Sequence, residues 1–147
     1  MTDERFSRTA RLLGSVAMDR LAGAHILLFG VGGVGGYVCE ALVRSGVGEI
    51  TLVDPDTVAL SNINRQIIAT EATLGQPKVT AAAERIRLIN PACVVHQRQE
   101  FYLPEQAEKY DFTKYDYVID AIDTVTAKLD IICRCREAGT PVISAMG

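Results

Sequence analysis

The sequence lacks a long hydrophobic run. Its apolar stretches all fall short of the ~20 residues that a helix needs to cross a membrane, and its polar first residues do not resemble a secretory signal. It also lacks internal repeats, low-complexity segments and linkers, so its 147 residues are expected to form one domain. We therefore expect a protein without a membrane span and with a cytoplasmic location.

Paired cysteines are missing as well. The four cysteines do not show the C-x-x-C spacing of a structural zinc site; they are Cys39, Cys93, Cys133 and Cys135. Cys39 and Cys133 fall within predicted helices of a domain large enough to need no disulfide bonds. We expect four reduced, structural thiols.

The sequence also has no excess of positive charge. Its net charge is −3, which gives no overall attraction to nucleic acid or to a membrane surface. A nucleic-acid substrate would therefore be held by a local patch or by another domain. With 48% hydrophobic and 22% charged residues, the chain is expected to be globular rather than disordered.

A glycine-rich segment after a short apolar run organises the chain. The aliphatic and aromatic residues 25–29 predict a buried strand of a parallel sheet. Four glycines follow it: Gly30, Gly32, Gly33 and Gly35. Such glycines make a tight turn and let the backbone approach a phosphate. Residues 34–45 are expected to form the next helix, whose N-terminal N–H groups attract anions.

An acidic residue completes this pattern. A second apolar run, residues 50–53, ends at Asp54, about 20 residues after the glycines. An acid in this place accepts hydrogen bonds from ribose hydroxyls. Strand, glycines, helix, strand and acid in this order predict a nucleotide-binding domain; a glycine turn without a ligand is the alternative.

The rest of the chain continues to alternate between strands and helices. After Asp54 we expect a polar loop or short helix, then a helix from Pro77 to residue 89 and a third strand that opens with residues 93–96. A short helix after Pro104, a strand over 117–123, a helix over 124–138 and a strand over 141–145 follow. This alternation predicts an α/β fold, with a Rossmann-like, open, mostly parallel sheet covered by helices on both faces.

Two features at the ends of the sequence extend this prediction. Residues 5–21 are expected to form an amphipathic helix that precedes the fold and packs against the domain or a second subunit. The sequence stops just past a strand, whereas sheets of this kind usually continue. We therefore expect an N-terminal fragment of a longer protein.

Polar and charged residues gather at the carboxyl edge of the predicted sheet, where open α/β sheets bind ligands. The segment after Asp54 carries Asp56, Asn62, Asn64, Arg65 and Gln66; Lys78 and Asp123 follow. Arg65 and Lys78 supply cations for phosphate oxygens, and Asp123 is an acid placed for Mg²⁺. This set favours a triphosphate over a dinucleotide, because the helix N-terminus largely compensates the charge of a pyrophosphate.

Each of these residues has a structural alternative. Asp123 would cap the helix that begins near Thr124, and Arg65 and Lys78 would be solvated surface charges. The three amides, Asn62, Asn64 and Gln66, would be ordinary turn formers.

Three further polar residues lie in or beside the predicted strands. Asp120 is expected to be buried and hydrogen-bonded at a strand end, with membership of the metal site as the alternative. For His25 and His96 the spacing identifies no acid–base partner, so the sequence assigns them no role.

Together the motifs resemble a known family. Those that carry the resemblance are Gly30-x-Gly32-Gly33-Val34-Gly35, Asp54-x-Asp56, Asn62-x-Asn64-Arg65-Gln66, Gly75-x-Pro77-Lys78 and Asp120-Ala121-Ile122-Asp123. They are similar to the ThiF-type, ATP-binding adenylation domain of the ubiquitin-activating superfamily, and the resemblance covers nearly all of residues 1–147. Bacterial members of the superfamily act in molybdopterin and thiamine synthesis. Within it, residues 5–14 and 118–123 most resemble the tRNA threonylcarbamoyladenosine dehydratases.

The resemblance implies roles for individual residues. Gly30, Gly32, Gly33 and Gly35 would line the phosphates of ATP, Asp54 would bind the ribose, and Asp56, Asn62 and Gln66 would complete the nucleotide site. Asn64, Arg65 and Lys78 would hold the phosphates, and Asp123 would organise Mg²⁺. Arg8 matches an arginine that a homodimer inserts into its partner's active site, so Arg8, Arg65, Lys78 and Asp123 are the implied catalytic residues.

The resemblance also implies a reaction. A substrate carboxylate attacks the α-phosphate of ATP and gives an acyl adenylate and pyrophosphate. In the dehydratases the carboxylate belongs to threonylcarbamoyladenosine in tRNA, and the activated acyl group cyclises with loss of water. The family continues past Gly147 into a loop that carries a catalytic cysteine in many members, so no cysteine here takes that role and this fragment alone is expected to be poorly active.

Other functions remain open on the sequence. The nearest alternative substrate is the C-terminal glycine of a ubiquitin-like sulfur-carrier protein, with a sulfur-transfer protein as a further candidate partner. An NAD-dependent oxidoreductase needs only the glycines and Asp54, and leaves Arg65, Lys78 and Asp123 without a task. A non-catalytic nucleotide-binding scaffold is the last alternative.

Overall fold

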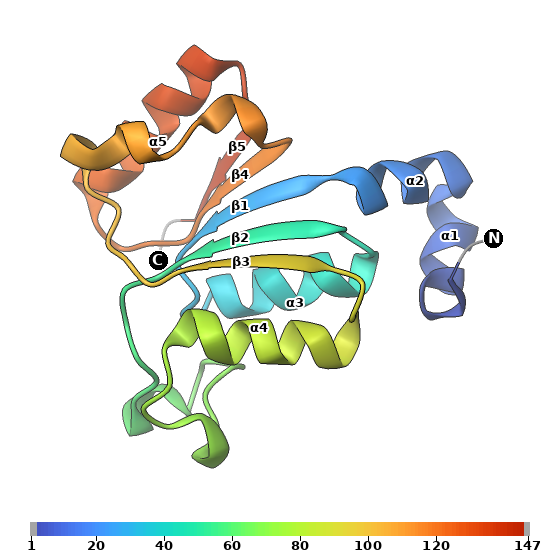
Figure 1. Cartoon of the computed structure of the whole chain (residues 1–147), viewed down its shortest axis with the longest axis horizontal. Helices are drawn as coiled ribbons and strands as arrows, with labels where there is room; N and C mark the ends of the chain where they lie inside the picture. The colour runs from blue at the N-terminus through green and yellow to red at the C-terminus, as the bar shows by residue number, and fades with distance from the viewer. Residues whose placement is uncertain (1–2, 146–147) are drawn as a thin grey trace.

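The protein is built on a five-stranded parallel sheet. The computed structural model describes residues 3–145 and orders the strands β3-β2-β1-β4-β5, each parallel to its neighbours (Figure 1). The strands are β1 (His25–Phe29), β2 (Glu49–Val53), β3 (Val94–Arg98), β4 (Tyr117–Asp120) and β5 (Val142–Ser144). The order reverses between β1 and β4, which places a crevice for a ligand at the carboxyl ends of these strands. The predicted α/β fold is confirmed.

Helices cover both faces of the sheet. One face carries α3 (Gly35–Ser45) and α4 (Lys78–Ile89). The other carries α5 (Val125–Ala138) together with two 3₁₀ segments, η4 (Pro104–Lys109) and η5 (Phe112–Lys114) (Figure 1). None of the helices formed by residues 3–145 has the length and apolar character needed to cross a membrane.

The side chains of β1 explain why its sequence is continuously apolar. Ile26 and Leu28 pack toward α3 and α4, whereas Leu27 and Phe29 pack toward α5 and the 3₁₀ segments. Successive strand residues point to opposite faces, so a strand covered on both sides needs apolar residues throughout. Each such side chain contributes about 1.5–3 kcal/mol when it is fully buried. This burial fixes β1, and hence the start of the glycine loop.

The N-terminal segment is not the single helix that its periodicity predicts. It forms η1 (Glu4–Phe6), α1 (Ser7–Leu13) and α2 (Ser15–Gly23), separated at Gly14. Gly14 has φ 82° and ψ 165°, a conformation outside the helical region that glycine adopts readily. The break lets the chain turn, so that Phe6 and Met18 both lie beside Gly46, in the turn before β2.

Three smaller expectations also change. The predicted strand over 117–123 ends at Asp120, because the Asp120 carboxylate accepts the N–H of Ile122 at 3.1 Å and turns the chain. β3 begins one residue later than expected and runs on to Arg98. Pro77 is the residue before α4 rather than its first helical position. The polar stretch after β2 contains two short 3₁₀ turns, η2 (Leu60–Asn62) and η3 (Glu71–Thr73).

Candidate nucleotide-binding site

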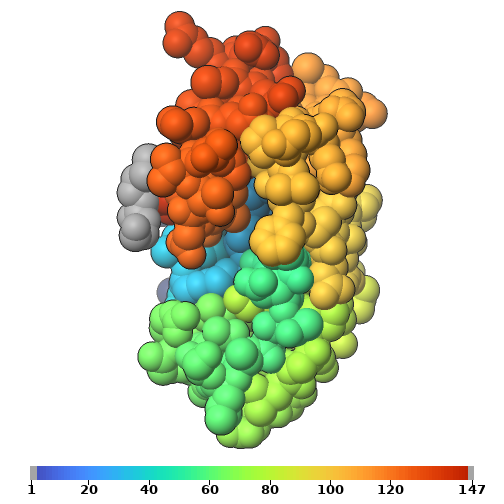
Figure 2. Space-filling model, turned by 90° about the vertical axis from the view of Figure 1, so that its left-hand side faces the viewer, coloured from blue at the N-terminus to red at the C-terminus, as the bar shows by residue number. Residues whose placement is uncertain are grey.

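A cleft of about 720 Å³ lies at the carboxyl ends of β1, β2 and β4. Seen from that side, the surface is hollowed between the segment after β2 and the segments around η4 and α5, with the start of α3 at the bottom (Figure 2). The register explains this convergence, because Phe29 is paired with both Val53 and Asp120, the last residues of the neighbouring strands. Residues that follow these three strands must therefore meet at one edge of the sheet.

Two of the loop glycines are required by the fold. Gly30 has φ 89°, and a Cβ added there would lie 2.5 Å from the carbonyl oxygen of Ala121. A Cβ at Gly35 would lie 1.8 Å from the carbonyl oxygen of Gly30. Both distances are impossible for real atoms, so these glycines let the loop pass close to itself and to the segment after β4.

The other two glycines have room around them. A Cβ at Gly32 would come no closer than 3.6 Å to a protein atom, the Nε2 of Gln66. At Gly33 the nearest atom would be the Cγ of Arg65, at 3.8 Å. Neither residue has a positive φ, and both line the cleft. Packing within the protein thus does not require glycine here, which favours close approach of a ligand to the backbone.

The N-terminus of α3 faces the same cleft. The helix starts at Gly35, and its first turn has neither a side-chain cap nor an acidic residue. The N–H groups of a first helical turn lack partners within the helix, and the helix dipole adds partial positive charge there. This end of α3 is therefore suited to bind an anion.

Asp54 holds the glycine loop in place. Its side chain is buried, with Oδ2 accepting the N–H of Val31 at 2.8 Å and Oδ1 accepting the N–H of Asp56 at 2.9 Å. Each carboxylate oxygen keeps a lone pair, and Asp54 lines the cleft. The acid predicted for ribose thus also links the end of β2 to the loop after β1.

Lys78 places a buried ammonium group at the cleft. It is the first residue of α4 and only 6% exposed. Its Nζ lies 3.7 Å from Oδ2 of Asp56, whose side chain is 62% exposed. A long ion pair with a solvated carboxylate stabilises a buried cation only weakly. A phosphate group in the cleft would provide a stronger partner.

The predicted loop residues differ in their surroundings. Arg65 is exposed and lines the cleft, with Nη1 donating to the carbonyl oxygen of Ser61 at 3.0 Å and to Oδ1 of Asn64 at 2.9 Å. Asn62 lines the cleft and also makes a turn, because its Oδ1 accepts the N–H of Ala59 at 2.9 Å. Asn64 is not in the lining and contacts it through Arg65.

Gln66 presents an unpaired acceptor. Its side chain is buried and lines the cleft, and within residues 3–145 its Oε1 has no hydrogen-bond partner. A buried acceptor left unpaired costs about 1–3 kcal/mol. A donor on a ligand or a bound water would remove this cost.

Asp123 lies on the opposite wall of the cleft, in the loop between β4 and α5. It is exposed and lines the cleft. The residue that precedes α5 is Thr124, and no side chain caps this helix. The structural alternative for Asp123, capping α5, is therefore not what the fold uses. Its carboxylate has no hydrogen bond or ion pair with any other residue in 3–145, which leaves it available for a cation in the cleft.

Asp120 is buried behind this wall. Its Oδ2 accepts hydrogen bonds from Lys128 at 2.9 Å and Ser144 at 2.6 Å, and it has no exposed surface. These contacts join β4, α5 and β5. Asp120 is therefore the buried, hydrogen-bonded residue at a strand end that the sequence predicts, and not a ligand of the predicted metal site.

The cysteines offer no reactive thiolate near the cleft. All four are free, and burial raises the pKa of Cys39 to about 12 and the pKa values of Cys93 and Cys135 to about 11. These three thiols are therefore protonated near neutral pH. Cys133 is exposed on α5 and is not part of the cleft lining.

The profile of the ThiF family matches residues 6–147. The chain belongs to the ThiF family. It is 44% identical over 145 residues to tRNA threonylcarbamoyladenosine dehydratase of Haemophilus influenzae, covering 99% of this chain and 56% of that protein. The crystal structure of the Escherichia coli dehydratase, TcdA, in complex with ATP is similar at a TM-score of 0.93 and 45% identity, over 96% of this chain and 58% of that one.

Relatives with lower identity carry other names. The chain is 35% identical over 127 residues to molybdopterin-synthase adenylyltransferase of Escherichia coli, covering 86% of this chain and 50% of that protein. The chain spans little more than half the length of the curated dehydratases that it matches.

One predicted site residue of this ThiF domain lies far from the cleft. Arg8 is exposed on α1, at the end of the molecule where the strands begin, and it is not in the cleft lining (Figure 1). Gly35 is also absent from the lining, because it sits beneath Gly30. A single ThiF domain thus does not bring Arg8 to its own cleft.

The cleft also contains residues that the sequence did not single out. Glu100, Phe101 and Tyr102 line it, and Phe101 is 67% exposed. They follow β3, whose carboxyl end reaches the same edge as those of β1 and β2. Neighbouring parallel strands end at the same edge of a sheet. The predicted third strand could therefore have identified the residues that follow it as part of the cleft.

Proposed function

We propose that residues 1–147 form the ATP-binding adenylation domain of an enzyme that uses ATP and Mg²⁺ to activate a carboxylate. The observation that carries this proposal is the space at Gly32 and Gly33, which opens onto the uncapped start of α3 and the buried ammonium of Lys78. Backbone N–H groups, a helix N-terminus and a lysine together suit a chain of phosphates. The ATP complex of the similar dehydratase supports the same ligand.

The residues of the cleft divide among the parts of ATP. The glycine loop, Lys78 and Arg65 would hold the phosphates, with Asn64 orienting Arg65. Asp54 would accept hydrogen bonds from the ribose, and the exposed ring of Phe101 offers an apolar surface for the base.

Asp123 would hold Mg²⁺, which prefers oxygen ligands and neutralises phosphate charge in such sites.

We propose the following chemistry for this arrangement. A carboxylate oxygen attacks the α-phosphorus, the bond from that phosphorus to the bridging oxygen breaks, and pyrophosphate leaves with the electron pair. Negative charge builds up on the departing pyrophosphate in the transition state, and Lys78 and Arg65 would stabilise it. The acyl adenylate then carries AMP as a good leaving group.

We propose threonylcarbamoyladenosine in tRNA as the source of the carboxylate, with cyclisation and loss of water after adenylation. The names of the relatives at 44–45% identity support this choice. Adenylation of the C-terminal glycine of a sulfur-carrier protein is the second candidate, supported by the 35% identity to an adenylyltransferase of molybdopterin synthase. Under that alternative a sulfur-transfer protein is a further candidate partner.

We also propose that the enzyme is a homodimer in which Arg8 reaches the cleft of the partner subunit. Leu12, Leu13 and Val16 lie near Arg8 in the chain, on α1 and α2, and are 83%, 50% and 66% exposed. Covering these side chains with a second copy would remove apolar surface from water.

The experiment for the substrate is ATP–pyrophosphate exchange by the full-length protein with Mg²⁺. We expect exchange that requires tRNA carrying threonylcarbamoyladenosine. Pyrophosphate exchanges into ATP only when an acyl adenylate forms and reverts, and this needs the acyl substrate. Unmodified tRNA is the matched control. Exchange with a sulfur-carrier protein instead would establish the second candidate, and silence with both would contradict the proposed adenylation.

A further inference from the structure

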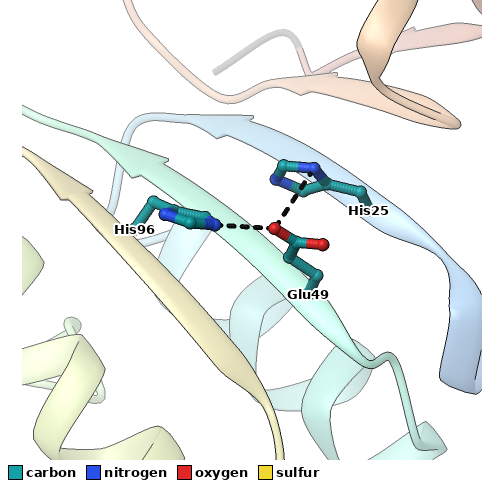
Figure 3. Close-up of side chains that lie close together, drawn as sticks. All are labelled: His25, Glu49 and His96. Atoms are coloured by element: carbon teal, nitrogen blue, oxygen red, sulfur yellow. Dashed lines mark hydrogen bonds and ion pairs between the residues drawn. The ribbon is translucent and has the colours of Figure 1, made fainter.

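Two histidines and a glutamate, side chains of types that can bind metals, meet on the sheet at the end of the strands away from the nucleotide cleft. His25 opens β1, Glu49 opens β2 and His96 lies in β3, and the three point toward one another (Figure 3). Oε1 of Glu49 lies 2.7 Å from Nε2 of His96 and 3.6 Å from Nδ1 of His25. The sequence contains two histidines, and both are here.

The strand register brings these residues together. His25 is paired with Glu49 across β1 and β2, and Thr51 is paired with His96 across β2 and β3. Since residues two apart on a strand share a face, Glu49 and His96 lie on the same side of the sheet. Spacing along the chain gave no partner for either histidine, because the partner is fixed by strand pairing.

The cluster is reachable from solvent. The side chains of His25, Glu49 and His96 are 21%, 38% and 49% exposed. β3 is an edge strand, which leaves one side of the cluster open. Water can therefore supply additional ligands to an ion bound there.

Contacts behind the cluster hold His25 in a suitable orientation. Its Nε2 lies 2.8 Å from Oγ1 of the buried Thr51, and its ring packs edge-on against Tyr115 at 4.7 Å. In the tautomer that carries its proton on Nε2, His25 donates to Thr51 and turns the lone pair of Nδ1 toward Glu49. Outer hydrogen bonds of this kind orient metal-binding histidines in many proteins.

We propose that His25, Glu49 and His96 bind a divalent transition-metal ion such as Zn²⁺, with water completing its coordination. Their donor atoms all lie within 4.8 Å of one another. Two ligands of a tetrahedral zinc ion, each about 2.1 Å from the metal, are roughly 3.4 Å apart. The 3.6 Å separation already fits this geometry, and the half-exposed His96 must move only slightly to open the 2.7 Å contact.

The chemistry of the donors selects the class of metal. Two imidazoles and a carboxylate form a known ligand set for zinc, whereas Mg²⁺ and Ca²⁺ prefer oxygen ligands alone. Within residues 3–145, the ion pairs of Glu49 are with these histidines, so no lysine or arginine competes for the carboxylate. Asp116, whose Oδ2 accepts the backbone N–H of His25 at 2.8 Å, adds negative charge beside the cluster.

Titration of the full-length protein with Zn²⁺ against a chromophoric chelator, without nucleotide, tests this site. We expect His96→Gln and Glu49→Gln to weaken one binding event by at least tenfold, because loss of an outer contact alone weakens metal sites by roughly 10–100-fold. The controls are Glu84→Gln, on an exposed carboxylate of α4, and Cys133→Ser, on the exposed thiol. Both should leave this affinity unchanged.

Co²⁺ provides a second readout through its visible absorption. We expect bands typical of nitrogen and oxygen ligands, lost in His25→Gln and His96→Gln. Thiolate charge-transfer bands, an absence of binding, or an affinity unchanged in His96→Gln would each overturn the proposal. Circular dichroism establishes that the variants are folded. ATP binding should be the same in all of them, so this result is independent of the proposed adenylation.

Discussion

At the scale of single residues, glycine stands at the four loop positions for different physical reasons. Gly30 and Gly35 lie where any Cβ would overlap a carbonyl oxygen, so the fold itself requires them. Gly32 and Gly33 border open space in the cleft. The motif alone does not separate these two kinds of glycine, since the neighbours of Gly30, Gly32 and Gly33 are Ala121, Gln66 and Arg65, far along the chain, and Gly35 meets Gly30 only in the folded turn.

This distinction predicts opposite results for two alanine substitutions. Gly32→Ala should leave the thermal unfolding midpoint close to that of the wild type and weaken ATP binding, because its methyl group projects into space for a phosphate. Gly35→Ala should destabilise the fold strongly, because its Cβ would meet an oxygen at 1.8 Å. Thermal melts and ATP titrations of both variants measure this. Wild-type ATP affinity in Gly32→Ala would contradict the assignment.

At the scale of helices and strands, ion pairs join neighbouring elements, and one of them is part-buried between two helices. Glu40 on α3 accepts hydrogen bonds from Arg85 on α4, with an Nε–Oε2 distance of 2.6 Å. Its side chain is 13% exposed. The hydrogen bond from Arg85, helped by a second from Arg44, lowers the pKa of Glu40 below its ordinary value of 4.5. The ionised form is therefore favoured in the folded protein.

This shift predicts a pH-dependent contribution to stability. When the pKa of a carboxyl is lower in the folded state than in the unfolded state, its ionisation stabilises the fold at pH values above the unfolded-state pKa. This stabilisation is lost as the pH falls through the folded-state pKa. Glu40→Gln should lower the free energy of unfolding by about 1–2 kcal/mol at pH 7 and by much less at pH 3. Urea denaturation at both pH values measures the difference. Glu84→Gln is the surface control, and an equal loss at both pH values would rule out this cause.

The ion pair of Asp120 and Lys128 lies on the other side of the sheet. Breaking it should lower the free energy of unfolding by more than the loss of the Glu40 ion pair does. Lys128 is 5% exposed, and its Nζ also donates to the carbonyl oxygen of Ala145 at 2.6 Å. Lys128→Met should destabilise the protein by about 3–5 kcal/mol, because it leaves the Asp120 carboxylate buried without a counter-charge.

The double variant Asp120→Asn/Lys128→Met should recover part of that loss in the same denaturation assay. If the double variant were as unstable as Lys128→Met alone, lost packing rather than the unpaired carboxylate charge would explain the destabilisation.

The elements also show what sequence can and cannot predict. The continuous apolar run of β1 and the apolar spacing of α4 identify these elements directly, because burial on two faces or on one face determines the pattern. The break at Gly14 comes from the backbone conformation of one glycine, and the early end of β4 comes from a local hydrogen bond between Asp120 and Ile122; hydrophobic periodicity reports neither. The cluster of His25, Glu49 and His96 depends instead on distant residues, so it becomes visible only once the three strands are paired.

At the scale of the whole molecule, α1, which carries Arg8, lies at the end of the sheet where the strands begin (Figure 1). The cleft lies at the carboxyl ends of the strands. If Arg8 acts in the partner's cleft, mixing Arg8→Ala with Asp123→Ala subunits should restore activity. One of the two clefts in such a heterodimer has both Arg8 and Asp123 intact. Pyrophosphate exchange by co-purified, differently tagged subunits measures this. Heterodimers that form and stay inactive would contradict the role in trans.

The central claim is that the cleft holds a triphosphate with Mg²⁺, and calorimetric titration of the intact protein tests it most directly. We predict that ATP binds once per chain, more tightly with Mg²⁺, and that Lys78→Ala weakens binding roughly tenfold or more because a charged hydrogen bond is lost. Lys114→Ala, at a lysine whose side chain is 76% exposed, should change nothing. Binding of NAD⁺ as tight as that of ATP, or ATP binding indifferent to both Mg²⁺ and Lys78, would contradict the account.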